Sequence, residues 1–279
     1  MSGVDARGHG PRDGEPDWIQ RDLELAVQAA REAGLRALAI RAAGRWEGDV
    51  LADVGDNACD GYVQGLLRGC RPEDGILSEE TADTTGRLER ERAWIVDPLD
   101  GTREYSQGRD DWAVHVALTV DGRCALGAVA LPAKERLLWG VCLAGHERFG
   151  AEGAGDLLAG GTSSSVPPRL AVSRSHTPPW VQRFASDLEA EMTPAGSVGN
   201  KVAMLLLGEA DVYVHQRGLK EWDTCAPEAV ARSLGWHVSK LRGESHTYNR
   251  PDPRNHELVI CRPEWKQRVL EAVARSGAL

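Results

Sequence analysis

The chain has 279 residues, of which 42% are hydrophobic and 27% charged, and a formal net charge of −9 at pH 7. This length suits one large domain or two closely packed halves, and the composition is that of an ordinary globular protein. The negative charge argues against a nucleic-acid polymer as partner, and no apolar run is long enough to span a bilayer.

The first sixteen residues, 1–16, are rich in glycine and charge and lack the apolar stretch of a signal peptide, so we expect a disordered tail. The six cysteines include no Cys-x-x-Cys pair and sit mostly in apolar surroundings. Such a set indicates buried thiols rather than a zinc site or a disulfide framework, and the reducing cytoplasm is the expected compartment.

The first half of the chain is expected to begin with two helices, over 17–43 and 57–67, and to continue with short strands at 75–78 and 93–96. Strands follow at 112–120, 124–131 and 136–142, and Asp121-Gly122 is a hairpin signal between the first two. A glycine-rich turn region is expected over 150–161, and the best candidate linker between the halves is 160–168.

The second half alternates strands and helices, and no solenoid repeat is present. Strands are expected at 169–172, 210–214 and 258–261, and helices at 179–190, 200–207, 224–234 and 264–274. We therefore predict one domain over 17–275, made of halves at about 17–160 and 166–275, with mixed α and β elements packed in layers.

The segment Asp97-Pro98-Leu99-Asp100-Gly101-Thr102 places two carboxylates three positions apart across a tight turn at the end of a strand. Two carboxylates this close cannot both stay ionised without a cation, and Mg²⁺ prefers oxygen ligands. Turn residues alone explain such a segment about half the time. Glu79-Glu80 also follows an apolar strand, however, and Asp223 stands at a helix start, where it could simply be a cap.

Three segments together resemble the inositol monophosphatase-like superfamily of metal-dependent, lithium-sensitive phosphatases: 78–80, 97–102 and 222–226. Further segments narrow the resemblance to CysQ-type 3'(2'),5'-bisphosphate nucleotidases: 100–105, 172–176, 196–201 and 221–223. The resemblance covers about 18–275 and implies an α+β or mixed α/β fold, a layered αβαβα sandwich of the sugar phosphatase type.

The resemblance also implies a role for each matching residue. Glu79, Asp97 and the Leu99 carbonyl would bind one Mg²⁺, and Asp97, Asp100 and Asp223 a second; a third ion is kept open. Glu79 and Thr102, with Asp97, would form the catalytic set, and Glu80 and Asp60 would support it. The expected substrate contacts are Gly101, Thr102, Arg103, Ser173, Arg174, His176, Gly196, Ser197, Lys201 and Glu221.

The implied activity is hydrolysis of 3'-phosphoadenosine 5'-phosphate to AMP and phosphate, in the context of sulfur metabolism. Inositol monophosphate or fructose 1,6-bisphosphate as substrate is an alternative, and a non-catalytic metal-binding regulator is an alternative of another class. A homodimer is kept open. The family's Thr-x-x-Asp segment has no threonine here, and Asp60 matches only by position, which weakens the support for a third ion.

Two other readings of single motifs are disfavoured. The aspartates at 97 and 100 are three apart, unlike the Asp-x-Asp pair of haloacid-dehalogenase phosphatases, so no nucleophilic aspartate is implied. His115 lies in an apolar strand, and we expect a satisfied core histidine rather than a ligand.

Overall fold

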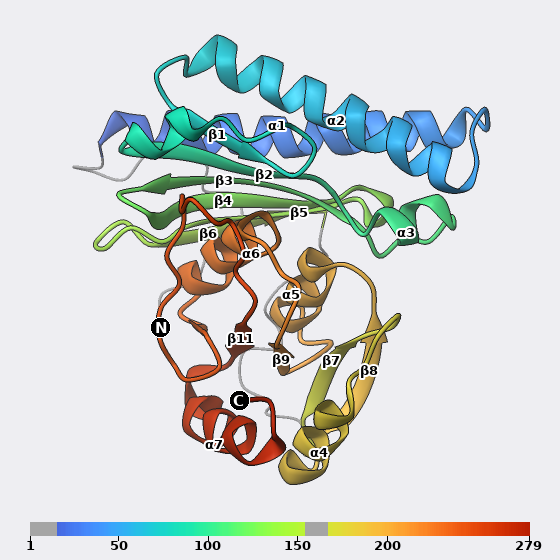
Figure 1. The fold of residues 1–279 in the computed structure, drawn as a ribbon, viewed down its shortest axis with the longest axis vertical. Coiled ribbons are helices and arrows are strands. Elements are labelled where there is room, and N and C mark those ends of the chain that lie inside the picture. Colours follow the sequence, from blue (N-terminus) through green and yellow to red (C-terminus); the bar gives the residue numbers. More distant parts are fainter. Residues whose placement is uncertain (1–15, 154–166) are drawn as a thin grey trace.

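Helices and sheets alternate in five layers in the computed structural model of this protein, which describes residues 16–153 and 167–279 (Figure 1). Two long helices cover the outer face of a first sheet, a second pair of helices lies between the two sheets, and a third pair covers the far face of the second sheet. The expected layered αβαβα sandwich is confirmed. The expected tail and most of the expected linker lie outside the described residues.

The first sheet has six strands in sequence order, with β1 parallel to β2 and every other neighbouring pair antiparallel. Its strands are β1 (Gly75–Ser78), β2 (Arg92–Asp100), β3 (Ala113–Val120), β4 (Arg123–Leu131), β5 (Arg136–Val141) and β6 (Arg148–Glu152). Helices α1 (Asp17–Ala42) and α2 (Gly48–Cys70) bury an apolar face against it, and the short helix α3 (Thr102–Ser106) follows β2 directly.

The second sheet has five strands in the order β10, β11, β9, β7, β8. They are β7 (Arg169–Ser173), β8 (Glu191–Ala195), β9 (Val212–His215), β10 (His237–Ser239) and β11 (Leu258–Cys261). Helices α5 (Val198–Leu206) and α6 (Glu221–Ser233) fill the space between the sheets, and α4 (Pro179–Leu188) and α7 (Lys266–Ser276) cover the outer face. Three buried apolar clusters fill the four spaces between these layers: one lies between α1, α2 and the first sheet, one surrounds α5 and α6 between the two sheets, and one lies between the second sheet and helices α4 and α7.

Helix α6 belongs to the second half of the chain but packs against the first sheet (Figure 1). Gly140 of β5 permits this close approach, because a Cβ there would overlap the Ala229 carbonyl and the Ser233 hydroxyl of α6. The first turn of α6 is thereby held near the ends of β1 and β2.

Most expected elements are confirmed within a few residues, but some local expectations were wrong or missing. Helix α2 begins at Gly48 instead of residue 57, and Arg148–Glu152 forms edge strand β6 where the glycine-rich turn region was expected to begin. Strands β8 and β10 were not expected. In addition, helix α6 begins at Glu221, which places Asp223 inside its first turn instead of before it.

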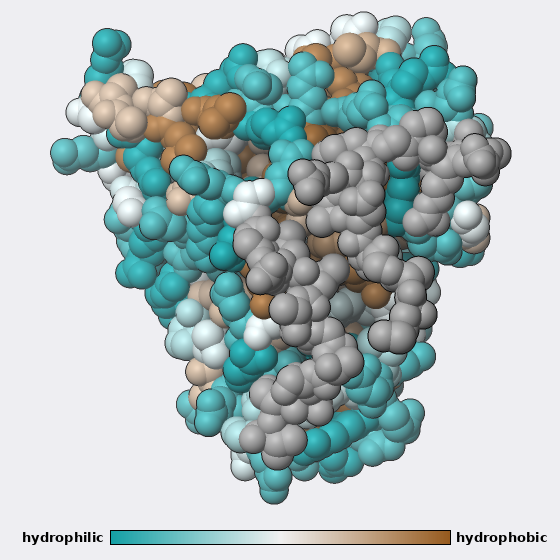
Figure 2. Space-filling view, turned by 180° about the vertical axis from the view of Figure 1, so that it is seen from behind, coloured by the Kyte–Doolittle hydropathy of each residue, from teal (hydrophilic) through white to brown (hydrophobic). Residues whose placement is uncertain are grey.

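The surface offers little contiguous apolar area. The exposed large hydrophobic side chains of the described residues are single ones on different elements: Leu35, Val50, Met192 and Leu279. The face in Figure 2 is mostly hydrophilic, with hydrophobic residues in small groups. Among the described residues no helix combines the length and hydropathy that a membrane span requires.

Candidate active site

Glu79 and Asp97 come side by side because each is the next residue after the parallel pairing of β1 with β2. Ser78 pairs with Val96 in register, and the Glu79 amide donates to the Val96 carbonyl at 3.3 Å. The carboxyl ends of parallel strands meet at one sheet edge, so the next residue of each strand reaches the same place. The two apolar runs that end in acids therefore converge, as the sequence indicated.

Asp97 and Asp100 would face opposite sides of a regular strand, because their spacing is odd. The register of β2 against β3 shifts between these two residues, however, and this bulge brings them to one side. Gly101 then turns the chain at φ +94°, in the left-handed region that glycine enters without cost. Asp97 is 1% exposed, and its Oδ1 accepts a hydrogen bond from the Leu99 amide at 3.1 Å.

Asp223 reaches the same point from the other half of the chain. Its Oδ2 accepts a hydrogen bond from the Lys220 amide at 2.6 Å, which fixes the carboxylate at the start of α6. Asp97, Asp100 and Asp223 each offer one oxygen, and these three atoms lie within 4.8 Å of one another. This acidic triad is the arrangement of oxygen donors that a hard divalent cation requires.

Asp100 is held by two hydrogen bonds. Ser197 Oγ donates to its Oδ2 at 2.5 Å and the Gly199 amide at 2.8 Å, both from the start of α5. Ser197 adopts φ +55°, an uncommon conformation for a residue other than glycine, and its Oγ also accepts from the Asn200 amide. The expected substrate contact Ser197 therefore already has a structural task, which is to orient a member of the acidic triad.

His115 is completely buried, but its surroundings are polar. Its Nε2 lies 3.2 Å from Asp100 Oδ2, and its Nδ1 lies 3.2 Å from the Trp222 carbonyl oxygen and 3.9 Å from Asp97 Oδ2. The expectation of a core histidine is thus correct in burial and incomplete in role. The side chain lies between the triad and the residue before Asp223, which only the register of β3 against β2 reveals.

The electrostatics of the triad show a site built for positive charge. Burial and the charge of Glu79 raise the pKa of Asp97 well above its usual range, and burial with the charge of Asp100 raises the pKa of Asp223 to about 7. Asp100 is the exception, because His115, Ser197 and Gly199 outweigh its burial and lower its pKa to about 2. A divalent cation would relieve this repulsion, and the donor set fits Mg²⁺.

Glu79 is near enough to the triad for its charge to act on Asp97 and Asp100, and Glu80 follows it; both residues are exposed. Desolvation of the carboxylate and the charges of Glu80 and Asp100 raise the pKa of Glu79 to about 7. Asp60 supports this loop directly, since its Oδ1 accepts from Ser78 Oγ at 2.5 Å and its Oδ2 from Thr81 Oγ1 at 2.7 Å. The supporting role expected of Asp60 thus has a structural basis.

Asp56, one helical turn before Asp60, was missed by the sequence reasoning. It is 5% exposed, and its Oδ1 has no hydrogen-bond partner among the described residues. Burial and the charges of Glu80 and Glu79 raise its pKa to about 8. The comparison with the family's Thr-x-x-Asp segment pointed to Asp60. The buried carboxylate of α2 that keeps an unpaired oxygen among the described residues is Asp56.

The other expected substrate contacts fall into three groups: residues near helix α3, residues that border a cavity, and residues that are more deeply buried. Thr102 is half-buried at the start of α3, Arg103 is exposed beside it, and Ser173 and His176 border a cavity of about 430 Å³ beyond the ends of β7 and β9. Arg174 approaches the α3 region, with Nη1 2.5 Å from Asp111 Oδ2 and 3.7 Å from Glu104 Oε1.

Gly196, Lys201 and Glu221 are more deeply placed. The Gly196 amide donates to Asp111 Oδ2 at 2.7 Å, and Lys201, 4% exposed, donates from Nζ to the Ser197 carbonyl at 2.5 Å. Burial lowers the pKa of Lys201, and four nearby carboxylates favour its charged form, Asp100 the most strongly. Glu221 is fully buried with both oxygens accepting hydrogen bonds, so its expected substrate contact stays a prediction that its position does not support.

The raised pKa values predict how pH acts on the metal-free protein. A carboxyl whose pKa is raised by folding contributes stability while it is protonated, and this contribution is lost as the pH rises through the folded value. For Asp223 and Glu79 that value is about 7, and for Asp56 about 8. We expect the Tm in a chelator to fall from about pH 4, where the unfolded carboxyls begin to ionise, to about pH 8, where the folded ones are ionised as well, and Mg²⁺ to restore it most strongly at the upper end.

Thermal denaturation at several pH values, with chelator or Mg²⁺, measures this effect. An Asp223→Asn variant is the matched control, since it removes one titrating carboxyl and should show a shallower fall. A Tm that rises through this range in the chelator would contradict the electrostatic description of the site.

Comparison with known proteins gives three concordant results. A family model described as the inositol monophosphatase family matches residues 18–278. A 3'-phosphoadenosine 5'-phosphate phosphatase of Mycobacterium leprae is 38% identical over 256 residues, which cover 87% of this chain and 90% of that protein. The human Golgi-resident adenosine 3',5'-bisphosphate 3'-phosphatase is 34% identical over 191 residues, 65% of this chain and 50% of that protein.

Solved structures agree with the fold. The crystal structure of CysQ from Bacteroides thetaiotaomicron superposes with a TM-score of 0.74 at 25% identity, and the match covers 88% of this chain and 98% of that one. An inositol monophosphatase from Anabaena gives a TM-score of 0.75 at 20% identity, which shows the shared fold alone.

Proposed function

This chain belongs to the inositol monophosphatase family, and on that premise we propose that it hydrolyses 3'-phosphoadenosine 5'-phosphate to AMP and phosphate with Mg²⁺ as cofactor. The observation that carries the chemistry is the acidic triad, because two halves of the chain deliver three carboxylates to one point. The relatives that act on 3'-phosphorylated adenosine nucleotides carry the choice of substrate.

The donor set favours Mg²⁺ over softer metals, since every candidate ligand atom is an oxygen and the triad consists of three aspartates. Two such ions, held by Glu79, Asp97, the Leu99 carbonyl, Asp100 and Asp223, would supply a polarised water and stabilise the charge that develops on the phosphate. Lithium sensitivity and a third ion near Glu79 and Asp56 are further parts of the proposal.

The chain's own groups then position the reactants. Thr102 and Glu79 orient the attacking water, and the amides of Gly101 and Thr102 bind oxygens of the phosphate being cleaved. Ser197 and His115 keep Asp100 and Asp97 in place, so the triad needs little rearrangement when substrate binds.

We propose that the nucleoside and its second phosphate occupy the cavity of about 430 Å³ bordered by Ser173, His176 and Tyr213. This volume is in the range of small-molecule sites, about 300–1,000 Å³. Tyr213 joins the cavity to the triad, because the Lys201 ammonium lies 5.3 Å from its ring centre and the charges of Asp100 and Asp223 help raise its pKa. Trp180 and Arg217 also line the cavity; Trp180 offers an apolar surface for the nucleoside, and Arg217 offers a cation for the second phosphate.

A phosphate-release panel tests this assignment. We expect kcat/KM for 3'-phosphoadenosine 5'-phosphate to exceed that for inositol monophosphate by at least about tenfold, since one charge-assisted contact to the second phosphate contributes about 1.5–3 kcal/mol. His176→Ala should raise KM for the nucleotide and leave inositol monophosphate unaffected. Lithium should inhibit at the Mg²⁺ concentration that supports turnover.

Other outcomes assign the other functions. A clear preference for inositol monophosphate or fructose 1,6-bisphosphate would replace the nucleotidase assignment by a sugar phosphatase. Mg²⁺ binding without release of phosphate from any of the three compounds would favour the metal-binding regulator. A cytoplasmic location and a homodimer remain predictions.

A further inference from the structure

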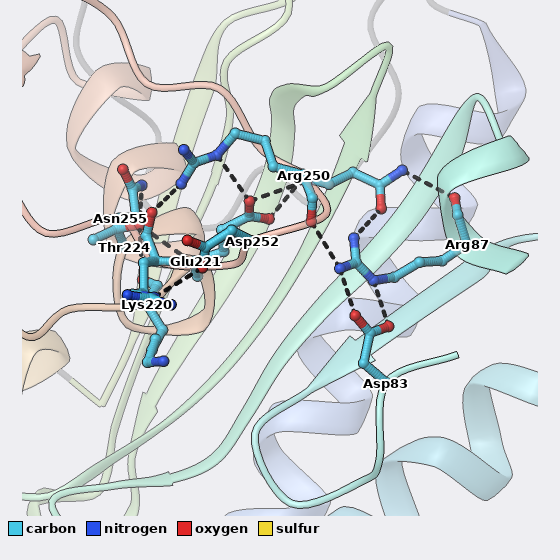
Figure 3. Close-up of polar contacts among 10 residues, drawn as sticks. Asp83, Arg87, Lys220, Glu221, Thr224, Arg250, Asp252 and Asn255 are labelled. Atoms are coloured by element: carbon cyan, nitrogen blue, oxygen red, sulfur yellow. Dashed lines mark hydrogen bonds and ion pairs between the residues drawn. The ribbon is translucent and has the colours of Figure 1, made fainter. Parts of the chain in front are cut away.

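The loop that carries Glu79 and the helix that carries Asp223 have no sheet pairing with one another. Glu79 and Glu80 stand in the loop between β1 and the 3₁₀ segment Thr85–Glu89, whereas Asp223 stands in α6 of the second half. Their separation therefore depends on side-chain contacts between the halves. One is the hydrogen bond of the Trp222 side chain to Glu79, and Arg87 provides a second, larger set (Figure 3).

Arg87 is 2% exposed and uses its guanidinium on both sides. Towards its own loop it makes a two-bonded pair with Asp83, Nε to Oδ1 at 2.7 Å and Nη2 to Oδ2 at 2.8 Å. Towards the second half it donates from Nη1 to Asn249 Oδ1 at 2.7 Å and from Nη2 to the Arg250 carbonyl at 2.8 Å. Figure 3 shows the guanidinium between Asp83 and the segment that carries Arg250.

Asn249 returns the contact, since its Nδ2 donates to the Arg87 carbonyl at 3.0 Å. Its backbone is held at φ +55°, an uncommon conformation for a residue with a side chain, and such conformations persist where surrounding contacts impose them. The amide of Asn249 then donates to Glu221 Oε2 at 2.6 Å, and the amide of Arg250 to Glu221 Oε1 at 3.1 Å. Glu221 is the first residue of α6, in the same turn as Asp223.

We propose that Asp83, Arg87, Asn249, Arg250 and Glu221 form a latch that sets the position of the Glu79–Glu80 loop relative to Asp223, and so the affinity of the site for its divalent cation. All five are positioning residues, since none belongs to the acidic triad. The latch also explains why Glu221, expected from the sequence to touch substrate, is buried with its oxygens occupied. The inference depends on the proposed function only through the shared metal site.

Isothermal titration calorimetry of the whole protein with Mg²⁺ alone tests the latch without any substrate. Asn249→Gly removes the side-chain link to Arg87 but suits the positive φ and keeps the amide bonded to Glu221, so the fold should be retained. We expect it to weaken Mg²⁺ binding about tenfold, the scale of the effect that partners of metal ligands have. Arg87→Lys should also weaken Mg²⁺ binding about tenfold. A lysine ammonium lacks the planar, multidentate geometry with which the guanidinium binds Asp83, Asn249 Oδ1 and the Arg250 carbonyl at the same time.

Two further measurements distinguish the latch from general destabilisation. Arg92→Lys is the matched control: Arg92 pairs with Asp74 and Asp22 at the start of β2 and should lose stability on substitution without any change in Mg²⁺ affinity. The double variant of Arg87 and Asn249 should bind Mg²⁺ about as weakly as either single variant, because both changes break one link. In activity assays, excess Mg²⁺ should restore most of the kcat of Asn249→Gly.

Unchanged Mg²⁺ affinity in both latch variants, or an equal loss in Arg92→Lys, would overturn the proposal. If the wild-type protein binds Mg²⁺ and the variants weaken it, but no nucleotide is hydrolysed, the latch stands and the proposed substrate fails. If the wild-type protein binds no Mg²⁺, both fail.

Discussion

Asp97→Asn should abolish turnover while the protein stays folded. Asp97 is 1% exposed and lies within ligand distance of Asp100 and Asp223, so its replacement removes charge and geometry for both proposed metal positions at once. We expect phosphate release to fall by about a thousandfold or more, the scale of losing one preorganised electrostatic partner. The Tm of the metal-free variant should equal or exceed that of the wild type, because the charge of Glu79 no longer opposes a buried carboxylate.

Phosphate release at saturating Mg²⁺ and thermal denaturation in a chelator measure the two parts of this prediction. Asp110→Asn is a suitable control, since Asp110 is an exposed aspartate beyond α3 with a single ion pair to Arg41. A variant at position 97 with a near wild-type rate would refute the metal assignment. A large loss of Tm in the chelator would instead show that the Asp97 carboxylate supports the fold.

Thr102→Ala should lower kcat about a hundredfold and leave KM nearly unchanged. The proposed task of the hydroxyl is to align a water for attack, and such a group acts in the transition state more than in substrate binding. The position suits this task, because Thr102 is half-buried at the first residue of α3, directly after the turn that carries Asp100.

Thr102→Ser is the matched variant, since it keeps the hydroxyl and should recover most of the rate. Steady-state kinetics at saturating Mg²⁺ separate kcat from KM for both variants. If Thr102→Ala raises KM at constant kcat, Thr102 holds the substrate instead of the water.

Strands β1 and β2, which lead to Glu79 and Asp97, were the most predictable elements of the site, because strong local patterns define them. Apolar strands that end in acids identified β1 and β2, and the Asp-Pro-Leu-Asp-Gly-Thr segment identified the turn. Edge strand β8 has no such pattern: it carries Pro194, most of its residues face solvent, and an edge position tolerates both. Helix α2 begins at a glycine with positive φ, which the sequence suggests as a stop rather than a start.

The site residues that were missed or given another role depend on long-range pairing. His115 lies beside Asp97 and Asp100 only because β3 pairs with β2 in one register, and no local sequence pattern specifies that register. The charges of Glu79 and Glu80 act on Asp56 only because α2 packs on β2 in one orientation. Lys201 and Glu221 read as surface or substrate residues in sequence, but tertiary packing covers both.

The delivery of Asp223 by a helix of the second half has a consequence for biosynthesis. The first sheet, with Asp97 and Asp100, is complete in sequence long before α6 leaves the ribosome, and amino-terminal parts of a chain generally fold first. A nascent chain can therefore pair the strands of this sheet while its acidic turn still lacks the third carboxylate and the covering helix. Completion of the acidic triad must wait for the carboxyl-terminal half, so a translation product that ends early keeps two close, repelling aspartates without the third carboxylate and is a natural substrate for quality-control proteases.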